Sequence, residues 1–282
     1  MAVIEMPHLG TAPTKPTGPI LPDVIASEWT KIRTVRSTYW TLFAAAFIMI
    51  GISVLICLIV AATWGTTSAK NRLSFDPVGS TLGAGAVLAQ LAIAVLGVLV
   101  ITSEYNNSMI RSTFAAVPQR LTVFAAKAGV FAVVTFVVTT TASLVAFLVG
   151  QAILSTASGH GYNGIGVGLG SPGALREVIG TGMYMAVLGL LALSLGTIIR
   201  KTAGAITAVV GMVFILPILA SLLPGSMNSL QKFLPSSAGE AFFNTAASST
   251  NVLSPWVGLG VFCLWAAIGL TVAGALLVRR DA

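Results

Sequence analysis

The sequence predicts an all-α integral membrane protein with six transmembrane helices, and its composition and the spacing of its charges carry that prediction. Of its 282 residues, 56% are hydrophobic, and only 15 are Lys or Arg and 8 are Asp or Glu. Charged residues thus make up 8% of the chain, compared with about 25% in soluble domains. So few charges cannot cover the surface of a water-soluble enzyme, and so hydrophobic a chain is not disordered.

The charges are clustered, and the intervals between clusters are long enough to cross a membrane. Six stretches of at least 22 residues contain no Asp, Glu, Lys, Arg or His. A helix needs about 20 mostly apolar residues to cross a ~30 Å hydrocarbon core. These runs are continuous, unlike the alternating segments of barrel strands. The predicted spans are Thr38–Ala62, Thr81–Thr102, Ala128–Leu154, Leu175–Ile199, Ala203–Leu223 and Pro255–Val278.

The basic residues orient these spans, because cytoplasmic flanks hold the excess of Lys and Arg. With both termini in the cytoplasm, the inner segments hold 11 Lys and Arg and the outer segments hold four. Both termini are therefore predicted to be cytoplasmic. The net charge of +7 then reflects this topology and contact with anionic membrane lipids. No basic domain with interleaved aromatic residues is found, so no nucleic-acid partner is expected.

Two segments precede the first span. Residues 1–22 hold five of the 12 prolines and are predicted to be a disordered cytoplasmic tail, whereas residues 23–282 form one membrane domain. Over Asp23–Arg36, apolar residues recur at helical spacing and the charged residues lie off that stripe. The pattern predicts an amphipathic helix in the membrane interface, and a simple basic anchor for the first span is the alternative. The residues expected at the interface are Ile25, Trp29, Ile32, Arg33 and Arg36.

The loop Glu104–Lys127 is cytoplasmic by the charge rule and longer than a helical turn requires. Ile110, Phe114 and Val117 form an apolar edge at helical spacing, which Pro118 ends. A short helix of this kind must bury that edge, either on the membrane surface or in a groove of a partner protein. Beside the edge, Arg111 can pair with an acidic group of such a partner or with Glu104.

Two segments carry a resemblance to a known family. Val24–Leu42 (VIASEWTKIRTVRSTYWTL) is similar to the beginning of actinobacterial permeases of the ABC-2 class, and Thr102–Arg120 (TSEYNNSMIRSTFAAVPQR) resembles their first cytoplasmic loop. The six-span layout agrees with that family, and the resemblance covers Pro22–Ala282. The sequence departs from the family at Ser108, where glycine is common.

The resemblance implies a division of labour between subunits. Ser108–Ala116 would be a coupling helix that docks on a separate ATPase subunit, which holds ATP and Mg²⁺, and Asp23–Arg36 a connecting helix. Leu230–Asn251 would form short helices on the outer side. Two ATPase subunits and a second permease half, a copy of this chain or a paralogue, would complete the transporter in a bacterial plasma membrane. The coupling residues would be Glu104, Ser108, Ile110, Arg111, Phe114 and Val117.

The chain lacks the sequence signals of an enzyme. It has no G-x-x-x-x-G-K-[ST] phosphate loop, so no nucleotide is expected to bind in that way. Residues 164–170 (GIGVGLG) miss the G-x-G-x-x-G spacing and are interpreted as an outer loop. Cys57 and Cys263 lie in predicted spans without metal-ligand spacing. We therefore expect no catalytic residue, metal or cofactor in this chain.

The predicted spans are nearly free of charge, which argues against proton coupling and ion pumping. The polar residues Gln90, Thr139, Thr140 and Ser143 are candidates for lining a translocation path, although hydroxyls at such depth also bond backbone carbonyls one turn back. Gly85 with Ala89 forms a pair of small residues that lets helices pack closely. Pro217 is expected to kink the fifth span.

These observations lead to one functional hypothesis with two alternatives. The first is the membrane subunit of an ATP-driven exporter of an amphipathic or lipophilic substrate; export rather than import follows from the family resemblance alone. A membrane sensor or assembly module that docks a cytoplasmic partner is the second. A stand-alone channel or carrier is the third, and it would need no partner.

Overall fold

The structure is a computed structural model that describes residues 21–106, 120–159, 162–222, 230–243 and 253–279. Within these residues, six helices are long and apolar enough to cross a membrane, which confirms the prediction of an all-α membrane protein with six candidate spans. They are α2 (Arg36–Thr63), α4 (Pro77–Asn106), α6 (Arg120–Leu154), α7 (Ala174–Ile199), the composite of α8 (Thr202–Val210), η2 (Gly211–Ile215) and α9 (Leu216–Ser221), and α12 (Pro255–Arg279).

Shorter elements join and flank these helices. A two-residue antiparallel strand pair, β1–β2, connects α6 to α7, and two short helices stand between α9 and α12, within the segment where such helices were expected. The predicted interfacial helix is present two residues early, and its last predicted residue, Arg36, begins α2 instead. The short elements are α1 (Leu21–Thr34), η1 (Trp64–Thr66), α3 (Ala69–Leu73), β1 (Ser158–Gly159), β2 (Tyr162–Asn163), η3 (Gln231–Phe233) and α11 (Pro235–Phe243).

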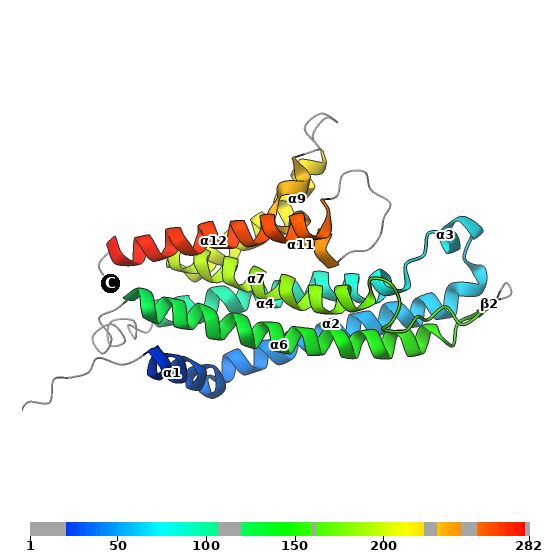
Figure 1. The fold of residues 1–282 in the computed structure, drawn as a ribbon, viewed down its shortest axis with the longest axis horizontal. Coiled ribbons are helices and arrows are strands. Elements are labelled where there is room, and N and C mark those ends of the chain that lie inside the picture. The colour runs from blue at the N-terminus through cyan, green and yellow to red at the C-terminus, as the bar shows by residue number, and fades with distance from the viewer. Residues whose placement is uncertain (1–20, 107–119, 160–161, 223–229, 244–252, 280–282) are drawn as a thin grey trace, which may run out of the picture.

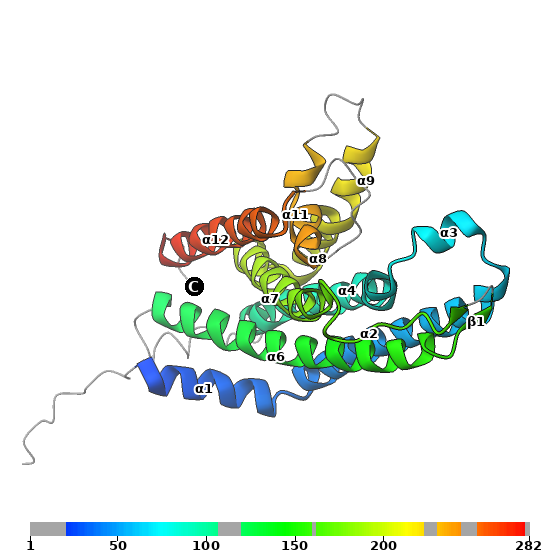
Figure 2. The ribbon, with the colours of Figure 1, turned by 45° about the vertical axis from the view of Figure 1, so that its right-hand side comes forward.

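Helices α2, α4, α6 and α7 lie side by side along the long axis of the molecule (Figure 1). α1, the end of α4 and the beginning of α6 meet at one end, which we call the basic end, and α3 and the strand pair stand at the other. α7 is central, because it packs against α4, α6, α8, α11 and α12. Its Tyr184 is fully buried between the rings of Phe243 and Phe262. Figure 2 shows α9 leading away from this bundle beside α11.

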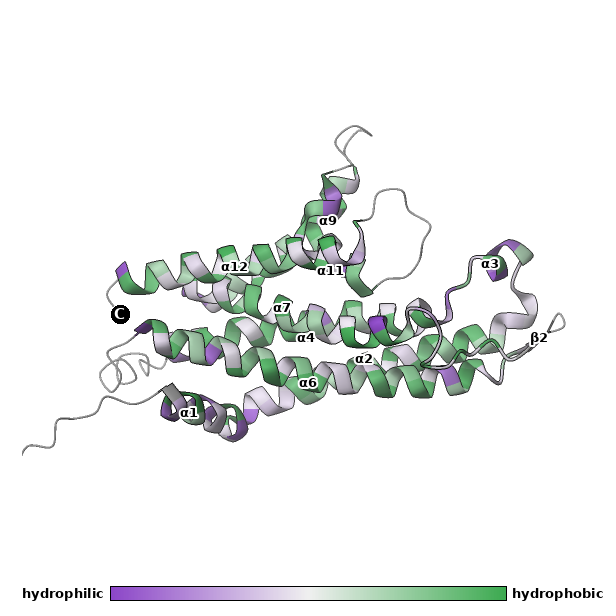
Figure 3. Cartoon of the chain, viewed as in Figure 1, coloured by the Kyte–Doolittle hydropathy of each residue, from purple (hydrophilic) through white to green (hydrophobic). Residues whose placement is uncertain are grey.

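The surface of the long helices is apolar, as a membrane environment requires. Figure 3 shows them mostly hydrophobic along their length, with hydrophilic residues on α1, on α3 and at helix ends. On α2, the rings of Tyr39, Trp40, Phe43 and Phe47 contact one another in sequence while remaining more than half exposed. A patch of this kind would be unfavourable in water and is ordinary against lipid, with Trp and Tyr nearest the helix end.

The fifth span contains an irregular turn one turn before its proline. Residues Gly211–Ile215 form a π-helix, in which the N–H of Leu216 donates to the carbonyl of Gly211. Pro217 lacks an N–H and its ring crowds the carbonyl four residues earlier, so regular α-helical bonding fails near Val213. Inserting a wide turn is one way for the backbone to absorb that conflict. The kink expected at Pro217 stays a prediction, and the wide turn before it was not anticipated from the sequence.

Small residues allow close contact between α2 and α4. A Cβ atom added to Gly85 would collide with the Met49 carbonyl oxygen and the Ser53 hydroxyl, whereas one added to Gly83 would have no atom within 4 Å. Ala89, the other member of the small pair, is fully buried. The close approach predicted from the small pair is therefore present and involves backbone.

This contact supports a prediction with an internal control. Gly85→Ala should lower the free energy of unfolding by about 1–3 kcal/mol, because the two backbones must separate to admit one methyl group. Gly83→Ala, two residues away on the same helix, should be neutral or stabilising, since alanine favours helices. Unfolding by added SDS in detergent micelles, followed by circular dichroism, measures both. Equal effects of the two variants would contradict the proposed close contact.

Candidate functional site

Four charged side chains from three helices meet at the basic end. The ammonium of Lys127 on α6 lies 2.5 Å from Glu28 Oε2 on α1 and 2.6 Å from Glu104 Oε1 on α4. Lys31 Nζ on α1 lies 2.6 Å from Glu28 Oε1 and 3.5 Å from Glu104 Oε1. We call these residues the four-charge cluster. Two acids and two bases alternate in it, so its net charge is zero.

The cluster is mostly buried, and its position follows from how α1 packs. Val24, Glu28 and Lys31 follow one another at helical spacing, and Val24 packs in a small core with Val123 and Ala126 of α6. Glu28 is 2% exposed and Lys127 is 5% exposed. A buried charge is tolerated only when it is paired, and here every charge has an opposite partner within 4 Å.

Helix α1 meets the protein with the side that carries Glu28 and not with its apolar stripe. Ile25 is 40% exposed and Trp29 is 46% exposed, whereas Glu28, which lies off the stripe, is buried. The apolar stripe therefore faces away from the bundle, except at Ile32, which packs against the core. This arrangement is compatible with a helix at a membrane surface, because the outward face is the apolar one. The remaining predicted interfacial residues, Arg33 and Arg36, are exposed.

Electrostatics favour the charged form of Lys31. Burial alone would lower its pKa, but the hydrogen bond to Glu28 and the charges of Glu28 and Glu104 outweigh that effect and raise the pKa above its ordinary value. Lys31 therefore stays an ammonium at any physiological pH. Its side chain is about one-third exposed (32%), the most accessible of the four.

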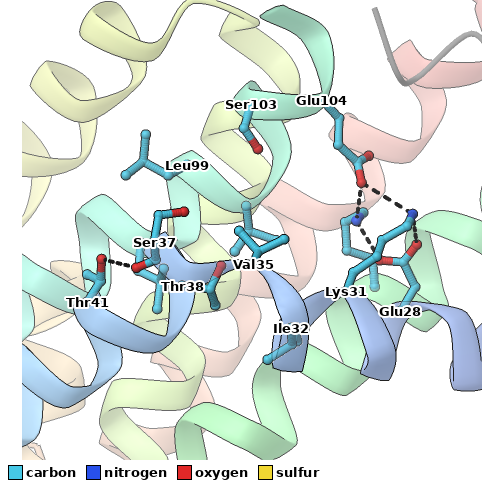
Figure 4. A pocket seen from close by; sticks show the side chains of 13 residues that line it. Glu28, Lys31, Ile32, Val35, Ser37, Thr38, Thr41, Leu99, Ser103 and Glu104 are labelled. Carbon is cyan, nitrogen blue, oxygen red and sulfur yellow. Dashed lines mark hydrogen bonds and ion pairs between the residues drawn. The ribbon is translucent and has the colours of Figure 1, made fainter. Parts of the chain in front are cut away.

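A cavity of about 350 Å³ opens beside the cluster, between α1, α2 and α4. Glu28, Lys31, Glu104 and Lys127 form one edge of this α1 pocket. Figure 4 shows Ser103 beside Glu104 on α4, and Ser37 on the α2 side of the pocket. The rest of the lining is mainly aliphatic. It comprises Ile32, Val35, Leu96, Leu99 and Val100, with Thr38 and Thr41.

Further contacts hold the helix ends around residues 107–119. The guanidinium of Arg200, the residue after α7, lies over the ring of Tyr105, 5.1 Å from its centroid. Arg200 has a φ of 61°, a left-handed conformation that ends α7. Arg120, at the first residue of α6, donates from Nη1 to the Leu277 carbonyl of α12 at 3.2 Å. The residues that flank this segment are thus bonded to α1, α7 and α12.

The structure places the predicted coupling residues only in part. Glu104 belongs to α4 and joins the four-charge cluster, so its carboxylate is held by Lys127 and Lys31. The remaining five predicted residues and the predicted helix Ser108–Ala116 lie outside the described residues, as does most of the predicted tail. Helix α6 begins at Arg120, eight residues before the predicted span, so Lys127 is helical and not part of a loop. Those five residues are Ser108, Ile110, Arg111, Phe114 and Val117.

The candidate lining residues are buried between helices, away from the α1 pocket. The Tyr184 hydroxyl donates to Gln90 Oε1 at 2.5 Å. The hydroxyl of Thr139 donates to the carbonyl of Thr135, one turn back, and that of Ser143 donates to the Val178 carbonyl on α7 at 2.8 Å. The Thr140 hydroxyl oxygen is buried and has no hydrogen-bond partner in the part of the chain that the structure describes. For Thr139 and Ser143 this geometry matches the structural alternative, in which hydroxyls bond backbone carbonyls.

An acidic residue outside the six spans was not anticipated. Glu240 lies on α11, which packs against α7 and α12. Its carboxylate makes no hydrogen bond or ion pair within the described part of the chain, and burial raises its pKa to about 7. No signal in the sequence marked it, because it is a single Glu between two long uncharged stretches and belongs to no motif.

Sequence reasoning also missed the cluster itself. The sequence pattern places Glu28 and Lys31 on the polar side of α1, and it uses Lys127 only as one of the basic residues that orient the spans. The available signal was the coincidence of Glu104 and Lys127 at the ends of two successive spans, each bordering a long uncharged run. An ionisable residue at such a place requires a partner. Glu104 and Lys127 pair with each other across 23 positions, and Lys127 also pairs with Glu28, which lies 99 positions away.

The four-charge cluster offers ion pairs that join three helices. Among the described residues, no group of three or more His, Cys, Asp or Glu side chains could hold a metal ion. Neither a scan against protein-family models nor a search of curated proteins finds a match to this chain. The functional argument therefore depends on the six-span fold and on the geometry of the basic end.

Proposed function

We propose that this chain is the membrane subunit of an ATP-driven exporter, in which a separate ATPase moves the segment 107–119 and the membrane helices follow. One observation carries the proposal. The two helices that enter and leave this segment, α4 and α6, are joined to each other and to α1 by the buried ion pairs of Lys127 with Glu104 and Glu28. A displacement of the segment would therefore reach three helices as one unit.

The other helix ends extend this transmission. Tyr105 contacts Arg200 at the end of α7, and Arg120 bonds the last turn of α12. A displacement of the end of α4 or of the beginning of α6 would therefore also reach α7 and α12. Four of the six spans would then respond. Packed helices with discrete alternative arrangements are the usual elements that carry such coupling. Because interiors are close-packed, small displacements at one end produce tilts and not local compression.

The chemistry of hydrolysis belongs to the partner in this proposal. Two ATPase subunits would hold ATP and Mg²⁺, and a second permease half, a copy of this chain or a paralogue, would complete the path. The cargo would be amphipathic or lipophilic, since the spans offer few polar groups to a hydrophilic solute. The resemblance of Val24–Leu42 and Thr102–Arg120 to ABC-2 permeases supports the export direction and a bacterial plasma membrane.

The test is co-purification of the tagged full chain in mild detergent from its native host. We expect a stoichiometric cytoplasmic protein that contains a phosphate loop and hydrolyses ATP. Phe114→Asp should abolish that association, because the apolar edge of the predicted coupling helix would carry a charge. Ser112→Asp introduces the same charge on the opposite face of that helix and should leave the partner bound.

The outcomes separate the proposal from its alternatives. Purification of the chain without any nucleotide-hydrolysing partner, together with solute flux through liposomes that contain this chain alone, would establish a stand-alone carrier instead. A bound partner whose ATPase rate is unaffected by the chain, with no cargo movement, would establish a sensor or assembly module.

A further inference from the structure

Lys31, the most exposed residue of the four-charge cluster, can form a further hydrogen bond in the α1 pocket. Lys31 carries three N–H donors, of which one is directed at Glu28 at 2.6 Å and another reaches Glu104 only at 3.5 Å. With about one-third of its side chain exposed (32%), Lys31 can bind an additional anionic oxygen while keeping its contact with Glu28. Lys127, 5% exposed and held by two carboxylates, has no such access.

The same edge also offers an acceptor. Both ammonium groups contact Glu104 through Oε1, as Figure 4 shows, and Oε2 accepts no hydrogen bond within the described residues. Ser103, the residue before Glu104, and Ser37 on α2 present exposed hydroxyls to the same cavity. Because the cluster is neutral as a whole, it complements neither a simple anion nor a simple cation. A ligand that carries one charge of each sign would match both vacant positions.

The apolar part of the lining adds a third requirement. Leu96, Leu99 and Val100 of α4, with Ile32 and Val35, supply the aliphatic part of the lining, which we call the aliphatic floor. A polar rim over an apolar floor is typical of a site for an amphiphile. The pocket also lies at the end of the spans, beside the outward-facing Ile25 and Trp29 of α1, which is where headgroups of a surrounding bilayer would stand.

From these three features we infer that the α1 pocket binds the headgroup of one zwitterionic phospholipid of the phosphatidylethanolamine class. Its phosphate contacts Lys31 and Ser37, its ammonium contacts Glu104 Oε2, and the first methylenes of one acyl chain cover the aliphatic floor. At about 350 Å³ the cavity holds a headgroup and not a whole lipid, so the remaining chains stay in the bilayer. The site does not depend on the proposed ATP-driven transport.

The test is native mass spectrometry of the full-length chain, purified in detergent and titrated with phosphatidylethanolamine. We expect one lipid to bind at least about tenfold more tightly than phosphatidylglycerol, which lacks the ammonium. Lys31→Gln should weaken binding about tenfold, as for loss of one charged hydrogen bond. Ser103→Leu, which fills the pocket and keeps all four charges, should do the same. Arg33→Gln, an equal charge change on the exposed face of α1, should have no effect.

Three results would overturn the inference. Equal weakening by Arg33→Gln and Lys31→Gln would mean diffuse attraction to the basic end. Equal affinity for phosphatidylglycerol would remove the role of Glu104 Oε2. Glycerophosphoethanolamine, which has the headgroup without acyl chains, is expected not to compete; competition at equal concentration would identify a soluble ligand and not a lipid. Circular dichroism of each variant verifies that the helices are retained.

Discussion

Lys127→Met is expected to lower the free energy of unfolding by about 3–5 kcal/mol, the usual loss when one partner of a buried ion pair is removed. The reason lies in the two carboxylates that Lys127 holds. Without it, Glu28 and Glu104 would share Lys31 alone, which contacts Glu104 at only 3.5 Å. One negative charge would then remain in a place with almost no access to water. Unfolding in SDS, followed by circular dichroism, measures the loss.

Two further variants separate charge from shape in this experiment. Lys31→Met removes the same type of side chain from the same cluster, but at its exposed side, and should cost about 1 kcal/mol or less. Adding Glu104→Gln to Lys127→Met removes the excess negative charge and should recover part of the loss. Equal losses for the two lysine variants, or no recovery in the double variant, would show that the cluster is not a buried electrostatic unit.

Glu240→Gln is expected to remove a pH dependence of stability and to stabilise the protein by up to about 3 kcal/mol above pH 7. Burial raises the pKa of Glu240 from 4.5 to about 7, so the folded state favours the protonated form. The contribution of Glu240 to stability is then full below pH 4.5 and is lost as the pH rises to about 7. Between these values Glu240 ionises in the unfolded chain but stays largely protonated in the folded protein. A shift of this size corresponds to about 3 kcal/mol.

The measurement is the free energy of unfolding of the purified protein at several pH values between 4.5 and 8.5. The wild type should lose stability across this interval, and Glu240→Gln should show that slope removed. Asp23→Asn serves as the control, since it removes an acid on the exposed side of α1 and should leave the slope in place. A slope that persists in Glu240→Gln would assign the titration to another group.

The six spans could be predicted from the sequence because hydrophobic length and absence of charge are local properties. The long uncharged run that ends before Glu104, for example, needs no tertiary information to be read as a helix. Helix limits were harder: α6 includes Arg120–Lys127, and its Arg120 guanidinium bonds the Leu277 carbonyl, far away in sequence. The irregular turn at Gly211–Ile215 likewise depends on how the backbone accommodates Pro217.

The charged site could not be assembled from the sequence, for the same reason. The burial of Glu28 depends on Lys127, which lies on another helix, and the periodicity within α1 cannot indicate that contact. Apolar residues of a membrane protein also face outward to lipid, so an apolar stripe does not identify the buried face as it does in a soluble helix. The sequence therefore indicated where charges occur but not which of them meet.

Although α1 and α2 follow one another in the sequence, with only Val35 between them, α1 is held mainly by other helices. Val35 is extended (φ −76°, ψ 104°) between α1 and α2. α1 packs more extensively against α6 than against α2, its successor in sequence, and its ion pairs go to α4 and α6. α1 is thus tied to two helices that follow much later in the sequence, and Val35 is the residue at which the chain leaves that attachment for the first span. Because α2 also packs along α4 and α6, these four helices are held together by contacts and ion pairs and not by the short connection at Val35.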